Sequence, residues 1–238
     1  MTSRTEWTQR LAQTDPADLT AFLGRNSGLP GPRGNLELAD AFAEWAPQEL
    51  ILRFAESDDE YLRFCGTEAV GRLISDDPDG AAMIELARTR AGDERWRVRE
   101  AAARALQIVG DSDLGTLRRI VADWLDSGDP LVQRAAIAAI CEPRLLRDDE
   151  TRAAALAGCA SATRWLEQRP AAERRDPAVR TLRQALGYCW SVAIAAAPGP
   201  GSVAFAALQR SRNPDVAWIV ASNARKARLR RVLDVPSG

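Results

Sequence analysis

The side chains that could act together in this chain lie in three separate segments. Trp96 and Glu100 are four residues apart, a spacing that puts both on one face of a helix. Arg134 occupies in DPLVQRAAIAAI the position that Glu100 occupies in ERWRVREAAARALQIV, and Tyr188 and Trp190 follow in ALGYCWSVAI. If these segments are equivalent helices of a stacked array, an aromatic wall, a carboxylate and an arginine converge on one concave face.

Such a face could bind a cationic group on its indoles, or a phosphate or carboxylate on its arginine. Structural roles stay open for the same residues. Trp96 and Trp190 could instead pack in the core or between repeats. Arg134 could pair with the turn aspartate of a neighbouring repeat, and Glu100 could be solvated or paired with an arginine of its own helix.

The densest basic cluster lies in NARKARLRR, near the end of the chain. It could contact phosphate or an acidic protein, or it could be a polar C-terminal cap whose cations favour a helix end. Residues 1–92 carry 9 basic and 16 acidic residues, a net of −7, and residues 93–238 carry 23 and 17, a net of +6. This polarity can mark a half that binds polyanions, although ordinary solvated helix faces would also produce it. The cluster comprises Arg225, Lys226, Arg228, Arg230 and Arg231.

The composition excludes several kinds of catalysis. The chain has no histidine, which removes Ser-His-Asp and Cys-His catalysis and the usual neutral-pH general base. Its four cysteines form no CxxC pair, so we expect packed, reduced thiols in a cytoplasmic protein, with no metal and no cofactor. No run reaches the roughly 18 apolar residues of a membrane helix, so no membrane partner is expected. The cysteines are Cys65, Cys141, Cys159 and Cys189.

Repeated helices must position these residues. Five segments share an acidic or Asp-Pro turn followed by apolar, Ala-rich spacing, with key apolar positions 36, 34, 47 and 37 residues apart. Those intervals suit two-helix repeats, and lone hairpins cannot bury their apolar faces without stacking. The sequence therefore predicts an all-α fold, a right-handed α-solenoid of stacked antiparallel helical hairpins. About five repeats are expected over residues 47–234, in a single continuous domain. The key positions are Leu62, Val98, Val132, Val179 and Val216.

Residues 1–46 depart from the repeat. Short helices are expected over residues 5–12, 16–24 and 36–45, with the loop NSGLPGPRGN before the last of them. The loop lacks the GK[ST] ending of a P-loop. Its amides could hold an anion together with Arg33, or it could be a turn that ends with Asn35 as a helix N-cap. We predict an N-terminal helical cap with a Gly/Pro loop.

The segments DPLVQRAAIAAI and ERWRVREAAARAL resemble HEAT repeats in their acidic turn and their Val, Arg and Ala spacing. The resemblance covers roughly residues 47–232. It implies an α-solenoid scaffold, and it says little about function, because folds of this kind host many functions.

A second resemblance is to the HEAT-repeat alkylpurine DNA glycosylases. In that family a groove Trp and an Asp one turn later face the lesion, an Arg in a VQRAA-like context holds the DNA backbone, and another Trp follows in an AIGW context. Trp96, Glu100, Arg134 and Tyr188 fall on those positions, with Glu in place of Asp and Tyr in place of Trp. The resemblance implies a carboxylate that stabilises an oxocarbenium-like sugar or positions water. The acidic first part of the chain opposes DNA binding, which rests on phosphate neutralisation.

The sequence therefore predicts a noncatalytic interaction module that binds a protein, or a nucleic acid, on its concave face. The alternative is a DNA-binding or DNA alkylation-repair protein in which Glu100 is catalytic. The expected binding residues are Trp96, Arg134, Tyr188, Trp190, Arg225, Lys226 and Arg228.

Overall fold

The structure is a computed structural model that describes residues 2–233. Helices begin where the sequence supplies caps. The aspartates at 59, 113, 129 and 176 accept hydrogen bonds from amides of the first helical turn, and proline follows directly at 130 and 177. An N-cap carboxylate satisfies amides that have no partner inside the helix, and proline at the first position loses no hydrogen bond. The acidic and Asp-Pro turns therefore fix where the repeated helices start.

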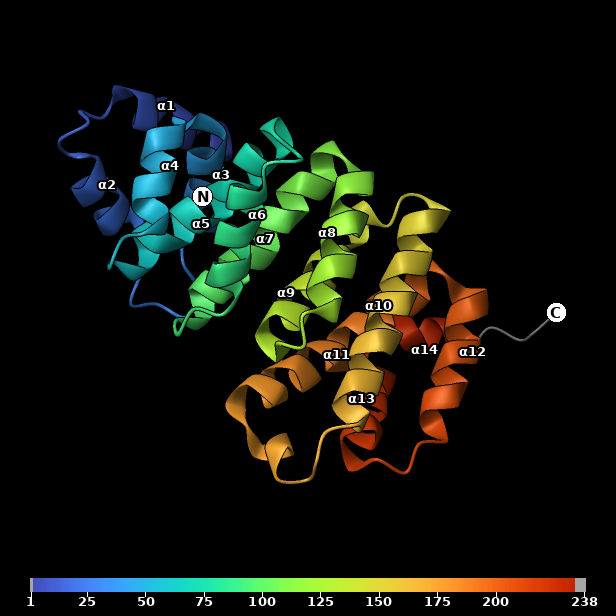
Figure 1. Cartoon of the computed structure of the whole chain (residues 1–238). Coiled ribbons are helices and arrows are strands. Elements are labelled where there is room, and N and C mark those ends of the chain that lie inside the picture. Colours follow the sequence, from blue (N-terminus) through green and yellow to red (C-terminus); the bar gives the residue numbers. More distant parts are fainter. Residues whose placement is uncertain (1, 234–238) are drawn as a thin grey trace. The chain divides into compact units, whose positions relative to one another are not determined.

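The chain divides into two compact units, Met1–Ser112 and Asp113–Gly238. In the first unit α5 packs against α3 on one side and α7 on the other, while α4 covers α5 and α6 covers α7 (Figure 1). Helix α1 packs on α3. The helices are α1 (Arg4–Gln13), α2 (Leu19–Asn26), α3 (Leu36–Trp45), α4 (Gln48–Ala55), α5 (Glu60–Asp76), α6 (Ala81–Ala91) and α7 (Trp96–Ser112).

Two glycines let α5 approach its neighbours closely. A Cβ on Gly66 would lie 2.1 Å from the backbone nitrogen of Ala55, and one on Gly71 would lie 2.2 Å from the carbonyl oxygen of Ala105. Any side chain at these positions would collide with backbone of α4 or α7. The loop before α3 is held as well, because the Tyr61 hydroxyl donates to the Asn35 carbonyl at 2.7 Å.

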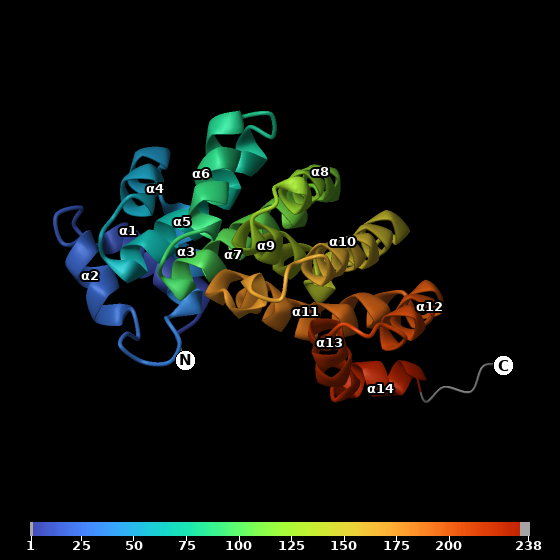
Figure 2. The same cartoon turned by 60° about the horizontal axis from the view of Figure 1, so that its bottom comes forward.

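In the second unit α11 is the central helix and packs against α9, α10, α12, α13 and α14 (Figure 2). Single 3-10 turns, Pro143–Leu145 and Glu173–Arg175, lie on either side of α10. The α-helices are α8 (Leu114–Asp126), α9 (Pro130–Ile140), α10 (Asp149–Glu167), α11 (Pro177–Ala196), α12 (Pro198–Gln209), α13 (Pro214–Ala224) and α14 (Ala227–Leu233).

The prediction of an all-α solenoid of stacked antiparallel hairpins is confirmed. The hairpins are α4–α5 and α6–α7 in the first unit, and α8–α9, α10–α11 and α12–α13 in the second. Residues 2–233 contain no strand. The boundary between the units falls between α7 and α8, inside the predicted repeats. The division into a cap over residues 1–46 and repeats over residues 47–234 stays a prediction.

Within residues 2–233 no helix combines the length and the apolarity that crossing a membrane requires. All four cysteines are free and buried, as expected for packed thiols. Cys141 and Cys159 come together in the second unit, with their Sγ atoms 3.7 Å apart. No group of three or more His, Cys, Asp or Glu side chains in the described part of the chain is arranged to hold a metal ion.

Candidate functional site

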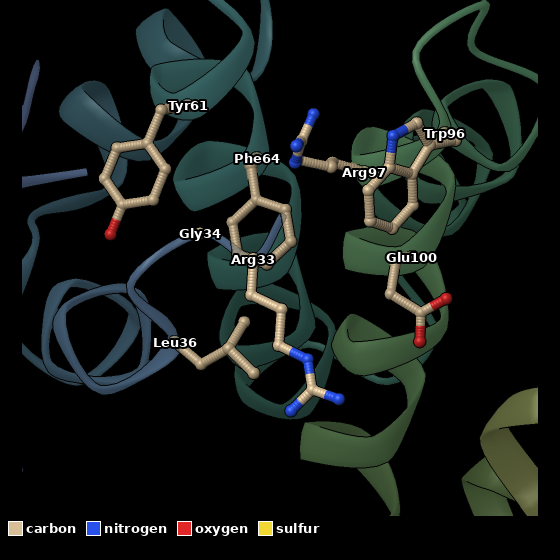
Figure 3. Close-up of a pocket in the computed structure, with 8 residues that line it drawn as sticks. All are labelled: Arg33, Gly34, Leu36, Tyr61, Phe64, Trp96, Arg97 and Glu100. Carbon is tan, nitrogen blue, oxygen red and sulfur yellow. The ribbon is translucent and has the colours of Figure 1, made fainter. Parts of the chain in front are cut away.

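The first unit contains a pocket of about 210 Å³ where α5, α7 and the loop before α3 meet (Figure 3). Its surface is largely apolar and carries a few polar groups, the usual composition of a binding site. In Figure 3 the Phe64 and Trp96 rings stand on either side, with the Glu100 carboxylate below the indole. The lining residues are Arg33, Gly34, Leu36, Tyr61, Phe64, Trp96, Arg97 and Glu100.

Three aromatic side chains form the walls. Tyr61 and Phe64, three residues apart on α5, are stacked with centroids 6.2 Å apart and planes 3° apart. Both are buried, so their positions are fixed by the core. Trp96, at the start of α7, is 51% exposed, and Leu36 at the opposite rim is 40% exposed. The pocket thus joins rigid aromatic walls to uncovered apolar surface.

Arg97 fixes one end of the pocket. Its guanidinium donates to the Glu60 carboxylate at 3.1 Å and to the Gly31 carbonyl at 3.0 Å, and it lies 4.6 Å from the centroid of the Trp96 ring. These contacts tie the Gly/Pro loop to α5 and α7 and place a cation on one face of the indole. A second cavity, of about 400 Å³, is lined in part by the same loop, and Tyr61 and Arg97 line both cavities.

Two further charged groups border the pocket. Glu100 is half-buried one turn after Trp96, and Arg33 reaches the pocket from the loop. The Arg33 side chain is exposed. Asn35 accepts a hydrogen bond from the Leu38 amide, so the predicted N-cap is confirmed, and the same loop also brings Arg33 to the pocket.

A buried charge network lies in the same unit and joins α3, α5 and α7. Arg104 donates to Glu68 at 2.7 Å and to Asp40 at 2.6 Å. Burial raises the pKa of Glu68 to about 7, although Arg104 acts in the opposite direction. Burial also raises the pKa of Tyr61 far above its ordinary value, so its hydroxyl stays a donor to Asn35. The network fixes the helices that carry the pocket.

The structure brings together two of the predicted site residues and adds others. Trp96 and Glu100 line one pocket, and the exposure of Trp96 argues against the alternative that it is a core residue. Tyr61 and Phe64 were missed, although Phe64 occupies in its repeat the position that Glu100 occupies in the next, two residues after the key apolar residue. That equivalence could have identified it.

Arg134 lies on α9 in the second unit, and the pocket is complete without it. The convergence of Arg134 with Trp96 and Glu100 stays a prediction. A pairing of a repeat arginine with the turn aspartate of a neighbouring repeat, the alternative considered for Arg134, occurs within the first unit, where Arg63 donates to Asp93 at 2.9 Å.

The prediction that Trp190 contributes to a binding face is wrong. Trp190 is 1% exposed in the centre of the second unit, and its indole nitrogen donates to the Thr163 hydroxyl at 3.0 Å. A buried indole of this kind is a core residue with its one donor satisfied. Tyr188, two residues earlier, is 41% exposed and contacts Lys226 and Arg228. Arg225, in the same basic cluster, lies between α13 and α14 and is exposed.

No protein-family model matches the chain, and no curated protein matches it. Among solved structures, an engineered protein is 18% identical over 97% of this chain and 96% of its own, with a TM-score of 0.40. A designed armadillo repeat protein is 14% identical over 94% and 98%, with a TM-score of 0.39. Another, in complex with the peptide (KR)4, is 14% identical over 92% and 96%, with a TM-score of 0.39. The helical-repeat architecture itself rests on the helices and packing described above.

Proposed function

We propose that this chain is a noncatalytic interaction module of the HEAT-repeat type that binds a protein partner. The aromatic pocket would receive one large apolar side chain of that partner. The half-exposed indole of Trp96 beside the rigid Tyr61 and Phe64 carries this proposal. Aromatic surfaces of this kind are frequent hot spots of protein interfaces.

An apolar anchor suits the pocket better than a cationic one. Arg97 already lies over the Trp96 ring, and the Arg33 guanidinium reaches the same space. A second cation entering between them would be repelled, whereas an apolar side chain would only displace water. The four buried, free cysteines also support a reducing compartment, and we propose the cytoplasm.

The test is a peptide-display selection on the intact chain, followed by fluorescence anisotropy of the enriched peptides. We expect enriched peptides to share one large apolar residue. Their affinity should fall about thirtyfold in Trp96→Ala, the loss of one hot-spot side chain. Trp165→Ala, which removes a half-buried tryptophan of the second unit, is the matched control and should leave binding unchanged. Equal binding by Trp96→Ala, or no shared apolar residue, would refute the proposal.

A second candidate is a DNA alkylation-repair protein of the HEAT-repeat glycosylase type. The observation that favours it is that Trp96 and Glu100 line one aromatic pocket, as the resemblance implies. Indole faces attract a cationic alkylated base, and a carboxylate beside it could stabilise a developing positive charge on the sugar. The net charge of −7 over residues 1–92 weighs against it, and so do the guanidinium groups of Arg33 and Arg97 at the pocket.

Release of an N7-alkylated base from duplex DNA tests this candidate directly. Under it, the intact chain releases the base and Glu100→Gln does not, while both bind the DNA. Absence of release from the wild-type chain would exclude the glycosylase reaction and leave the interaction module.

A further inference from the structure

The last helices of the second unit are almost devoid of acidic side chains. Residues 177–233 contain nine basic residues and one acidic residue, Asp215. Asp215 is 5% exposed, and its carboxylate is paired with Arg183 at 2.6 Å and Arg174 at 3.6 Å. Residues 177–233 therefore carry a large net positive charge. The basic residues are Arg180, Arg183, Arg210, Arg212, Arg225, Lys226, Arg228, Arg230 and Arg231.

Part of this charge is held in place by Tyr188. The Arg228 guanidinium lies 4.8 Å from the ring centroid and donates to the Tyr188 hydroxyl at 3.0 Å. The Lys226 ammonium lies 5.5 Å from the same centroid. Two cations from the α13–α14 junction and α14 are thus gathered around an exposed tyrosine of α11. Because the Arg228 and Lys226 side chains are already ordered, they lose less conformational entropy when an anion binds them.

A second exposed aromatic residue packs on the residue of α11 that precedes Tyr188. Trp218 on α13 is 37% exposed and packs on Gly187 of α11, where a Cβ would come within 2.7 Å of the indole. The Arg183 guanidinium lies 4.9 Å from the Trp218 ring. Gly187 directly precedes Tyr188 in α11, so α13 meets α11 one residue before the tyrosine. Figure 2 shows α11, α13 and α14 side by side in this unit.

We propose that these five side chains form a docking surface for an acidic segment of a partner protein. We name this surface, made of Arg183, Tyr188, Trp218, Lys226 and Arg228, the cationic face. Carboxylates of the segment would bind Arg228 and Lys226, and its apolar side chains would cover the exposed parts of Tyr188 and Trp218. Guanidinium and carboxylate groups form charge-assisted hydrogen bonds, which are stronger than neutral ones.

The placement of the cations favours a peptide over a nucleic acid. Single-stranded nucleic acids bind by stacking bases on open aromatic faces. Here both exposed rings already carry a cation of the protein on a face. The cationic face lies wholly in the second unit, so this inference is independent of the pocket that contains Trp96.

The experiment titrates the intact chain with a labelled peptide of repeating Glu-Glu-Leu triplets, followed by fluorescence anisotropy. Peptides of Gln-Gln-Leu and Lys-Lys-Leu triplets are the charge controls. We expect binding of the acidic peptide alone, weakening steeply as salt is raised because exposed charges are screened. Reversal of two charges in Lys226→Glu/Arg228→Glu should weaken it about tenfold or more.

The matched control is Arg144→Glu/Arg147→Glu, which reverses two exposed cations between α9 and α10. It should bind the acidic peptide as the wild type does. Loss of binding in the control pair would mean that net charge alone acts, and the proposal would fail. It would also fail if the acidic peptide does not bind. If a labelled oligothymidylate bound more tightly than the peptide, through Lys226 and Arg228, the partner would be a nucleic acid and the proposal would be wrong. If the chain associated with itself and the Lys226 and Arg228 reversals abolished this association, the partner would be a second copy of the chain and the proposal would be wrong.

Discussion

Two tryptophans of this chain have opposite surroundings. Trp96 stands at the first residue of α7 with half of its surface uncovered, while Trp190 lies near the middle of α11 under the helices that surround it. The indole nitrogen of Trp190 has a hydrogen-bond acceptor in Thr163, whose own hydroxyl donates to the Cys159 carbonyl. The first tryptophan is available to a partner, and the second stabilises the second unit.

Replacing Trp190 by alanine should destabilise the chain by about 3–5 kcal/mol, because it removes a fully buried aromatic side chain and leaves a cavity. Urea unfolding followed by circular dichroism measures the loss. Trp165→Ala removes a tryptophan that is only half-buried and should cost clearly less. Equal losses in the two variants would contradict the central position of Trp190.

Glu68 should make stability depend on pH. Its pKa of about 7 in the folded chain lies above the ordinary 4.5, so the folded state holds more protons between these values. The contribution of Glu68 to the free energy of unfolding is therefore largest below about pH 4.5 and is lost as the pH rises toward 7. Linkage places the loss at up to about 3 kcal/mol.

Comparison with Glu68→Gln isolates this effect, because glutamine cannot titrate. Between pH 5 and pH 8 the unfolding midpoint of the wild type should fall relative to that of the variant. Glu44→Gln, at an exposed carboxylate that pairs with Arg4, should follow the wild type. A wild type and a Glu68→Gln variant with the same pH profile would show that Glu68 does not titrate in this range.

At the scale of the element, α5 holds the first unit together. It packs on α3, α4, α6 and α7, and Gly66 and Gly71 allow two of these approaches. Its aromatic residues Tyr61 and Phe64 form walls of the pocket, and its Glu68 lies in the charge network. The geometry of the pocket therefore depends on how closely α5 packs.

Gly66→Ala should destabilise the chain by about 2 kcal/mol, since the new methyl group meets the backbone of α4 and cannot be accommodated by a rotamer change. Gly24→Ala is the matched control. It lies in α2 with nothing within 4 Å of the added Cβ, and should be neutral or stabilising by up to about 1 kcal/mol. Thermal denaturation compares the two, and similar effects would contradict the close approach.

At the scale of the whole molecule, each unit has its own core and its own charge. Residues 1–112 carry 13 basic and 20 acidic residues, a net of −7, and residues 113–238 carry 19 and 13, a net of +6. The charge asymmetry seen along the sequence thus follows the division into units. The two proposed binding surfaces, one apolar and one cationic, lie in different units.

Separate cores predict separate local stability. Hydrogen exchange measured by mass spectrometry should show faster exchange in α3, α5 and α7 for Gly66→Ala, and in α9, α10 and α11 for Trp190→Ala. Each variant should leave the other unit close to the wild-type rate. Uniform acceleration over the whole chain in both variants would instead show one cooperative unit.

Much of this architecture could be predicted from sequence, because its determinants are local. Acidic caps, Asp-Pro turns and Ala-rich apolar spacing are read within one repeat, and they gave the positions of the hairpin helices. The pocket was only half predictable. The Trp96–Glu100 pair follows from helical spacing, but Arg33 reaches it from a loop some sixty residues away, held by Arg97 and Tyr61. The burial of Trp190 depends on several helices packed around α11, which no local pattern contains.

The close packing of α5 against α4 also limits which repeats could be exchanged, gained or lost. The position of Gly66, four residues after the key apolar residue, is filled by Ala102 in α7 and Ala136 in α9. If either helix replaced α5, the alanine methyl group at this position would collide with the backbone of α4. The hairpins therefore share a sequence pattern, but their helices cannot be exchanged for one another. Duplication or recombination that puts another repeat helix in the position of α5 would therefore destabilise the fold.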